Sequence, residues 1–231
     1  MSRLGAVVGL PIERTVLRLQ SPAFDKPPGH WIEVAGASGA RAEACAQRLL
    51  SRGATALISV GIAGGLDPQC RSGALVLASE VVDPAGVRVP TDGEWCRRLS
   101  DALRALQVRV APLAGTDNMA SSPHQKADLY RKTGAAAVDM ESHGVARAAI
   151  RQAVPFVVLR AVADPADRGL PASVTAGLGP DGAVRPFATA AALAAHPQEL
   201  PGLLSVAGST VAALLSLWRA IRAAGPALGP P

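Results

Sequence analysis

Carboxylates follow two apolar segments of this chain, each at the point where the segment gives way to polar residues. Glu141 follows residues 135–138, and Asp164 and Asp167 follow residues 155–163. Acidic side chains at the ends of buried strands commonly supply the acids and bases of an α/β active site. The pattern therefore predicts an active site built on these carboxylates.

A glycine-containing segment, residues 59–68, supplies a third candidate loop after an apolar strand. Backbone without a Cβ atom can come close to a ligand, so Gly64 and Gly65 can present N–H groups to a phosphate or to a nucleophilic water. The segment lacks the full Gly-x-Gly-x-x-Gly pattern that opens a helix, which disfavours a dinucleotide site. We expect the three segments to meet at one edge of a sheet.

Composition favours a single domain over residues 1–231. A chain of 231 residues, 49% of them hydrophobic, is long enough to bury a full core. The net charge of +5 comes from scattered arginines, and aromatic residues make up 3%, so we expect no nucleic-acid partner. A basic protein also suits an anionic substrate or membrane surface, and ordinary solvated charge is a further explanation.

Cysteine and histidine spacing argues against two common kinds of site. Cys45, Cys70 and Cys96 form no Cys-x-x-Cys pair, and the four histidines are dispersed. This pattern indicates reduced thiols in a cytoplasmic protein, with neither a disulfide framework nor a metal site. The apolar N-terminal run is too short for a signal peptide, which favours the same location.

Apolar runs without polar alternation predict strands that are buried on both faces. These strands cover residues 4–10, 31–34, 56–60, 74–82, 108–112, 135–138 and 155–162. Helical spacing predicts helices over residues 40–52, 99–106, 125–133 and 142–153, with a short helix around Leu17, and residues 179–182 carry a turn signal. The alternation predicts an α/β fold, a three-layer α/β/α sandwich with a mainly parallel, mixed sheet.

Residues 170–231 differ in character and are predicted to be a C-terminal extension packed on this domain. No charged residue occurs from Leu200 through Trp218, and the bulky apolar side chains of residues 200–221 fall largely on one helical stripe. This favours a docked amphipathic helix over a membrane-spanning one. Packing on the domain, packing on a dimer partner and contact with a membrane surface all stay open.

Three motifs together resemble those of the nucleoside phosphorylase and nucleosidase superfamily, which includes purine nucleoside phosphorylases and methylthioadenosine/S-adenosylhomocysteine nucleosidase. They are Thr-Asp-Asn-Met-Ala-Ser-Ser at 116–122, Val-Asp-Met-Glu-Ser at 138–142 and Arg-Ala-Val-Ala-Asp-Pro-Ala-Asp at 160–167. The resemblance covers roughly residues 4–168 and implies a phosphorylase/hydrolase-like fold. The first motif, with the apolar tail, is most similar to the hopanoid-associated phosphorylase branch.

This resemblance implies cleavage of the N-glycosidic bond of a purine nucleoside, with release of adenine from adenosylhopane, a nucleoside whose 5′ carbon carries a pentacyclic lipid. It implies no cofactor, although inorganic phosphate is an alternative co-substrate. It also implies a homo-oligomer, most simply a dimer. The location is then the cytoplasm, with peripheral contact at the inner face of the membrane as an alternative.

The same resemblance assigns roles to individual residues. Bond cleavage leaves negative charge on the purine and positive charge on the ribose, so one acid must protonate the base while another carboxylate supports the sugar. Asp164 would protonate N7, and the apolar run before it would raise its pKa. Glu141 would accept the ribose 2′ and 3′ hydroxyls. By the same resemblance, Met140 packs under the ribose, Met119 and Asn118 line the base pocket, and Asp167 is a supporting acid near the base.

The nucleophile site departs from the family pattern. Nucleosidases of this kind carry a glutamate that activates water, and an alignment on Gly9 puts Arg14 at its position and Glu13 one residue early. Glu13 is thus a candidate base and Arg14 a candidate phosphate ligand, while Ser59 stands where hexameric phosphorylases have an arginine. Hydrolysis and phosphorolysis both stay open. Gly9, Gly64 and Gly65 are predicted to hold the phosphate or water.

Two rival functions follow from these departures. One is a methylthioadenosine or adenosylhomocysteine nucleosidase acting on small substrates, against which the displaced Glu13 and the apolar tail both count. The other is a catalytically silent protein that binds a nucleoside or a lipid and keeps the fold after losing part of the nucleophile site.

Overall fold

A mixed sheet of eight strands runs through the computed structural model, which describes residues 3–21, 24, 30–177, 179 and 185–230. The strands are β1 (Leu4–Val8), β2 (Trp31–Val34), β3 (Ala56–Gly65), β4 (Leu75–Val82), β5 (Arg88–Pro90), β6 (Arg109–Gly115), β7 (Ala137–Asp139) and β8 (Phe156–Asp164). Their order is β2-β1-β3-β7-β6-β4-β5, and β8 pairs with both β3 and β4. The β1–β2, β1–β3, β3–β8, β4–β6 and β6–β7 pairs are parallel, as predicted for a mainly parallel, mixed sheet.

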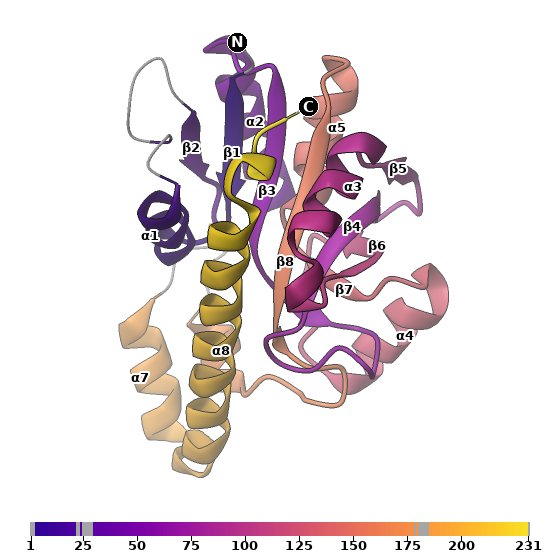
Figure 1. Cartoon of the computed structure of the whole chain (residues 1–231). Coiled ribbons are helices and arrows are strands. Elements are labelled where there is room, and N and C mark those ends of the chain that lie inside the picture. The colour runs from indigo at the N-terminus through magenta and orange to yellow at the C-terminus, as the bar shows by residue number, and fades with distance from the viewer. Residues whose placement is uncertain (1–2, 22–23, 25–29, 178, 180–184, 231) are drawn as a thin grey trace.

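Helices cover both faces of the sheet and complete the predicted three-layer sandwich (Figure 1). They are α1 (Pro11–Gln20), α2 (Gly39–Ser51), α3 (Gly93–Ala102), α4 (Pro123–Thr133), α5 (Ser142–Arg151), α6 (Ala172–Ala176), α7 (Pro186–Ala195) and α8 (Leu200–Ala224). Side chains of α1, α3 and α8 share one apolar core with the sheet, and those of α2 and α5 share another on the opposite face. Burial on both faces explains why the strands read as apolar runs without alternation.

Several predicted boundaries differ by up to three residues, and two predicted elements differ by more. The strand predicted to end at Val60 continues to Gly65, because its second half pairs with both β7 and β8. The helix predicted over residues 99–106 begins at Gly93 and ends at Ala102. Asp92 fixes that start, since its carboxylate accepts a hydrogen bond from the Trp95 N–H at 2.8 Å and so caps the first turn. The turn predicted at 179–182 lies, apart from Gly179, outside the described residues.

The predicted C-terminal helix is present as α8. Its second half packs on the sheet through small and apolar side chains, and its first half, with α7, extends past the sheet at the end where β8 leads into the loop after Asp164 (Figure 1). By length and composition, one stretch of the described residues, Pro197–Leu228, meets the criteria of a membrane span, with mean hydropathy 1.7 in its most apolar window. The buried residues on α8 are Ala213, Leu217, Ala220, Ile221 and Ala224.

Candidate active site

Seven of the eleven predicted site residues line a cavity of about 200 Å³ at the carboxyl ends of β1, β7 and β8. The carboxyl ends of these strands and the loops that follow them form one edge of the sheet, which is where ligands usually bind in α/β proteins. Four carboxylate residues from three separate segments line the cavity. Its lining comprises Gly9, Leu10, Glu13, Ala37, Ile62, Ala63, Gly64, Thr116, Met119, Ala120, Val138, Asp139, Met140, Glu141, Ala163, Asp164 and Leu170.

Glu13 lies in the first turn of α1, and its side chain folds back into the cavity. One carboxylate oxygen accepts the N–H groups of Gly9 and Leu10, each at 2.8 Å, and the other accepts the Ile62 N–H at 2.8 Å. The residue is 2% exposed. Burial raises the pKa of Glu13, and the charge of Arg160 and the three backbone donors oppose this shift. A carboxylate that comes one residue early in the alignment thus still lines the cavity, because the first turn of α1 places it there.

Glu141 lies opposite Glu13, between β7 and α5. One of its oxygens lies 3.1 Å from the position that a Cβ atom on Gly9 would take, so a side chain at residue 9 would crowd it. Burial first, and then the charge of Asp139, raise the pKa of Glu141 to about 8, while Arg160 lowers it. Asp139 itself accepts from the N–H and hydroxyl of Ser142, at 3.1 and 2.6 Å, and so fixes the start of α5.

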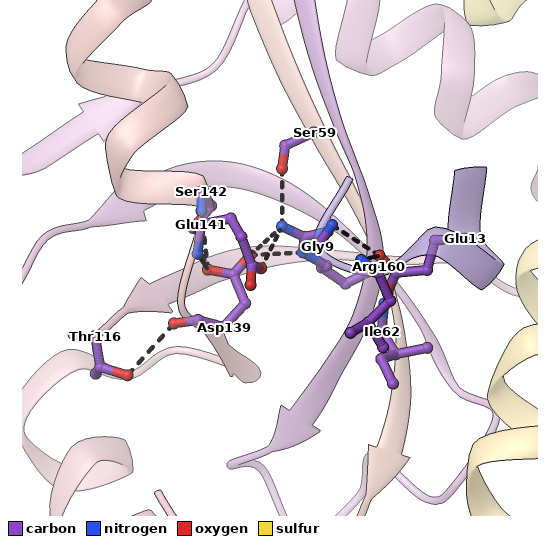
Figure 2. A network of polar contacts seen from close by, with 10 residues as sticks. Gly9, Glu13, Ser59, Ile62, Thr116, Asp139, Glu141, Ser142 and Arg160 are labelled. Atoms are coloured by element: carbon purple, nitrogen blue, oxygen red, sulfur yellow. Dashed lines mark hydrogen bonds and ion pairs between the residues drawn. The ribbon is translucent and has the colours of Figure 1, made fainter. Parts of the chain in front are cut away.

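Arg160 joins these carboxylates and was not among the predicted site residues. It lies in the middle of β8 and is 1% exposed. Figure 2 shows its guanidinium between Asp139, Glu141 and Ser59: Nε donates to Asp139 Oδ2 at 2.5 Å, and Nη2 donates to Ser59 Oγ at 2.8 Å and to Glu141 Oε2 at 3.3 Å. Nη1 is buried and has no hydrogen-bond partner among the described residues. A buried, unpaired donor beside a cavity is a candidate ligand contact.

Gly61 makes room for this network. A Cβ atom at residue 61 would lie 2.5 Å from Arg160 Nη1 and 2.7 Å from Glu13 Oε1, which is closer than side chains tolerate. The orphan N–H of Arg160 and the carboxylate of Glu13 therefore both lie close to the same backbone position on β3.

Asp164 ends β8 on another side of the cavity. Its side chain is 14% exposed, and one oxygen lies 2.5 Å from Nζ of Lys126, whose side chain is fully buried. Burial raises the pKa of Asp164, and the charge of Lys126 is the largest opposing influence. Lys126, like Arg160, was not predicted.

Two of the predicted glycines, Gly64 and Gly65, lie in strand β3 and not in a loop, and Gly9 comes directly after β1. Gly9 and Gly64 line the cavity, and Gly65 does not. Gly64 and Gly65 pair with Val138 and Ala137 of β7 as the last residues of β3. A Cβ atom on Gly64 would lie 3.3 Å from an oxygen of Asp164, so a larger residue at position 64 would crowd the carboxyl group of Asp164.

The remaining predicted residues divide into two groups. Met119 and Met140 line the cavity, in the loops that follow the neighbouring strands β6 and β7. Asn118 lines an adjoining hollow that also includes both methionines. Arg14 is exposed and is not part of the cavity lining. Asp167 has a side chain that is 70% exposed and pairs with Arg71 at 3.2 Å, also outside the lining.

Metal ligands do not cluster in the part of the chain that the structure describes: no group of three or more His, Cys, Asp or Glu side chains could hold an ion there. The three cysteines are unpaired and buried. His143 is buried with Nε2 3.1 Å from Asp117 Oδ1, and His124 is exposed beside Asp128. Neither histidine lines the cavity.

A buried set of carboxylates at the carboxyl edge of a mixed α/β sheet defines an enzyme-like site for a small molecule. The sequence model of the Phosphorylase superfamily matches residues 31–195, and the chain belongs to this family. The prediction of an enzyme of the nucleoside phosphorylase or N-ribosyl hydrolase type is confirmed at the level of the family. A comparison with curated proteins found no match.

Solved structures show the same fold. A futalosine hydrolase mutant of Helicobacter pylori is 15% identical, with a TM-score of 0.68 over 96% of this chain and 98% of its own. The H. pylori 5′-methylthioadenosine/S-adenosyl homocysteine nucleosidase, solved in complex with a pyrrolopyrimidine compound, is 19% identical, with a TM-score of 0.66 over 86% of this chain and 98% of its own. The corresponding Campylobacter jejuni nucleosidase is 19% identical, with a TM-score of 0.66 over 83% and 96%.

Proposed function

We propose that this protein hydrolyses the N-glycosidic bond of a purine nucleoside in the cavity between Glu13, Glu141 and Asp164. Asp164 gives its proton to N7 of the base, Glu13 takes a proton from the attacking water, and Glu141 accepts the ribose hydroxyls. The observation that carries this proposal is the meeting of three carboxylates around one cavity, with Glu13 and Glu141 buried and the Asp164 side chain 14% exposed. They come from three segments distant in sequence, and the bond needs an acid on one side and anionic groups on the other.

Electrostatics supports water over phosphate as the nucleophile. The backbone donors that could cradle a phosphate, the N–H groups of Gly9, Leu10 and Ile62, are already occupied by Glu13. Arg160 is the buried cation nearby, and it already pairs with Asp139 and Glu141. A phosphate dianion would meet more carboxylates than cations here, and Arg14 lies outside the lining. Water bridging Glu13 and the orphan Nη1 of Arg160 would satisfy both groups.

The base and ribose contacts are proposed for the same cavity. Met119 and Ala120 offer apolar surface to the purine, and Met140 lies beside Glu141 to pack under the ribose. Asn118 in the adjoining hollow would reach the ligand from its edge. Asp167 would act only through solvent or through movement of its loop, because its side chain points to Arg71.

For the 5′ substituent we propose a bulky apolar group, with adenosylhopane as the candidate substrate. Leu170 lines the cavity, and the same loop contacts α8, since Arg168 donates to Ser205 and Ser209 at 2.8 and 3.0 Å. The half of α8 next to this loop carries exposed Leu200 and Leu204. An apolar path from the cavity toward α8 would suit a lipid-bearing nucleoside. Exposed apolar residues on α8 also support a cytoplasmic enzyme that touches the inner membrane face, or that forms a homodimer through this helix.

A small thio-nucleoside is the second candidate substrate. The placement of Glu13 in the cavity favours it, because the displaced sequence position of this glutamate no longer counts against a nucleosidase of that kind.

The test is adenine release from adenosylhopane, with methylthioadenosine as the comparison substrate and D164N as the inactive control. Release from adenosylhopane that is lost in D164N is the expected result. Release from methylthioadenosine alone would overturn the proposed substrate and keep the reaction. Binding of adenosine analogues without release from either substrate would overturn the reaction and leave a silent nucleoside-binding protein.

A further inference from the structure

Lys126 is a fully buried basic residue that the proposed reaction has not used. It lies in α4, a helix with mainly polar residues, and its side chain is 0% exposed. Its Nζ lies 2.5 Å from Asp164 Oδ2. Burying an ammonium group costs free energy unless the group is paired and hydrogen-bonded. The groups that surround Nζ of Lys126 must therefore offset this cost.

Backbone carbonyls complete the surroundings of Lys126. Nζ donates to the carbonyl oxygens of Pro165 and Arg168, each at 2.8 Å, and lies 3.4 Å from that of Asp164. Carbonyl oxygens can only accept hydrogen bonds, and an ammonium group has three donors. Two donors go to the carbonyls and one to the carboxylate, so the ammonium form fits this environment. Lys126 thereby fixes both the loop after β8 and the carboxyl group at its start.

The electrostatic surroundings of Asp164 are simple. Lys126 acts on it from α4, and Arg168 acts more weakly from the following loop. The neighbouring strands contribute Gly64 and Val138, which carry no charge. Burial raises the pKa of Asp164, and Lys126 is the largest influence that opposes this shift.

We propose that Lys126 is a positioning residue that sets the acid strength of Asp164 and the pH range over which Asp164 can protonate the leaving base. This rests on the proposed function. In the step concerned, the O–H bond of Asp164 breaks, a bond between N7 and the proton forms, and the electron pair stays on the carboxyl oxygen. The new carboxylate then lies against the Lys126 ammonium group, which stabilises it in the transition state.

A purely structural role would give different results. If Lys126 only anchors the loop, its loss lowers stability and turnover at every pH. If it sets the acidity of Asp164, its loss also moves the pH at which Asp164 ionises. The pH profile therefore separates the two roles.

The experiment compares K126Q and K126M with K126R, which keeps the charge, and with K132M, which removes an exposed lysine from the same helix. In K126Q and K126M we expect kcat/KM at neutral pH to fall about tenfold and the alkaline limb of the pH profile to move up by roughly one unit. K126R should restore most of the profile, and K132M should match the wild type. A lower rate with an unmoved alkaline limb would overturn the proposal.

A second measurement does not depend on turnover. The ionisation of Asp164 in the free protein can be followed through its ¹³C-labelled carboxyl group, and we expect its pKa to rise in K126Q. If the pKa of Asp164 is unchanged in K126Q, the proposal about Lys126 is overturned, whether or not adenine is released. If the pKa of Asp164 rises in K126Q but the wild-type protein releases adenine from no nucleoside, the proposed function is rejected and the proposal about Lys126 is not. If the variants do not fold, the wild-type ¹⁵Nζ signal of Lys126 should be that of an ammonium group and should shift as Asp164 titrates, and no shift would overturn the proposal.

Discussion

The carboxyl groups on the two sides of the cavity are paired with basic groups in different ways. On one side, Glu13, Asp139 and Glu141 surround the single guanidinium of Arg160. On the other, Asp164 faces Lys126 in a pair of one carboxylate and one ammonium group. The first arrangement has more acidic than basic groups, so it favours protons and cationic ligands. The second is balanced, which lets a carboxylic acid lose its proton without leaving a buried charge unpaired.

This difference suggests that each side supports a different charge in the reaction. The carboxylate-rich side would stabilise the cationic ribose and activate water. The paired side would hold the acid that protonates the leaving base. Environment, and not residue type, would then decide which carboxyl group acts as acid and which as base.

The largest effect is expected for D164N. The amide keeps the shape of the side chain but cannot transfer a proton, so kcat should fall about a thousandfold, within the usual range for loss of a general acid. Binding of a nucleoside analogue, measured by calorimetry, should change little. D167N is the matched control, because that side chain is 70% exposed and outside the cavity lining. A fall of similar size in D167N would move the acid to that residue.

Replacing the proposed base should have a smaller effect. E13Q removes the proton acceptor but leaves Arg160 to hold water, so we expect kcat to fall about a hundredfold. Steady-state rates in phosphate-free buffer measure this change. R14A, on the next residue and outside the cavity, should keep the rate within about threefold. A strong loss in R14A together with a phosphate requirement would favour phosphorolysis.

Stability should respond to the loss of the central cation. R160M leaves buried carboxylates without their counter-ion, and we expect the free energy of unfolding to fall by about 3–5 kcal/mol in urea titrations. The double variant D139N/R160M should recover part of this loss, since it removes one of the stranded charges. R97M, on an exposed arginine of α3, is the control. Equal stability of R160M and R97M would show that the cluster is not held together by this charge.

The smallest effect is a pH dependence of stability. Because the pKa of Glu141 is raised to about 8 in the fold, from 4.5, its contribution is full below pH 4.5 and is lost as the pH rises through 8. The free energy of unfolding should therefore fall as the pH rises over this range. E141Q should flatten the curve, and E94Q, on an exposed glutamate, should not. If the free energy of unfolding of E141Q falls with pH as steeply as that of the wild type, the raised pKa belongs to a group other than Glu141.

Sequence alone could locate the carboxylates but not their partners. The apolar runs marked where β7 and β8 end, and the acidic residues that follow them were therefore visible as a site. Arg160 is one basic residue inside the most apolar strand, a signal that could have been noticed. Lys126 lies in a polar helix and gives no such signal, because its burial depends on how α4 packs against the loop after β8.

Boundaries failed for related reasons. Gly64 and Gly65 looked like a loop because glycine is frequent in turns, but pairing with two neighbouring strands holds them in β3. Glu13 looked misplaced by one residue in a linear alignment. Its reach into the cavity depends on the start of α1 at Pro11 and on the backbone donors of Gly9 and Ile62, which only the folded chain brings together.

The most direct test of the proposed hydrolysis is an experiment that identifies the nucleophile. Adenosylhopane and methylthioadenosine would be incubated with the wild-type protein in phosphate-free buffer made with ¹⁸O-water, and the sugar product analysed by mass spectrometry. If the protein hydrolyses the N-glycosidic bond, we expect adenine release without phosphate and one ¹⁸O atom at the sugar C1 position. Release only after addition of phosphate, with a sugar 1-phosphate as product, would contradict it.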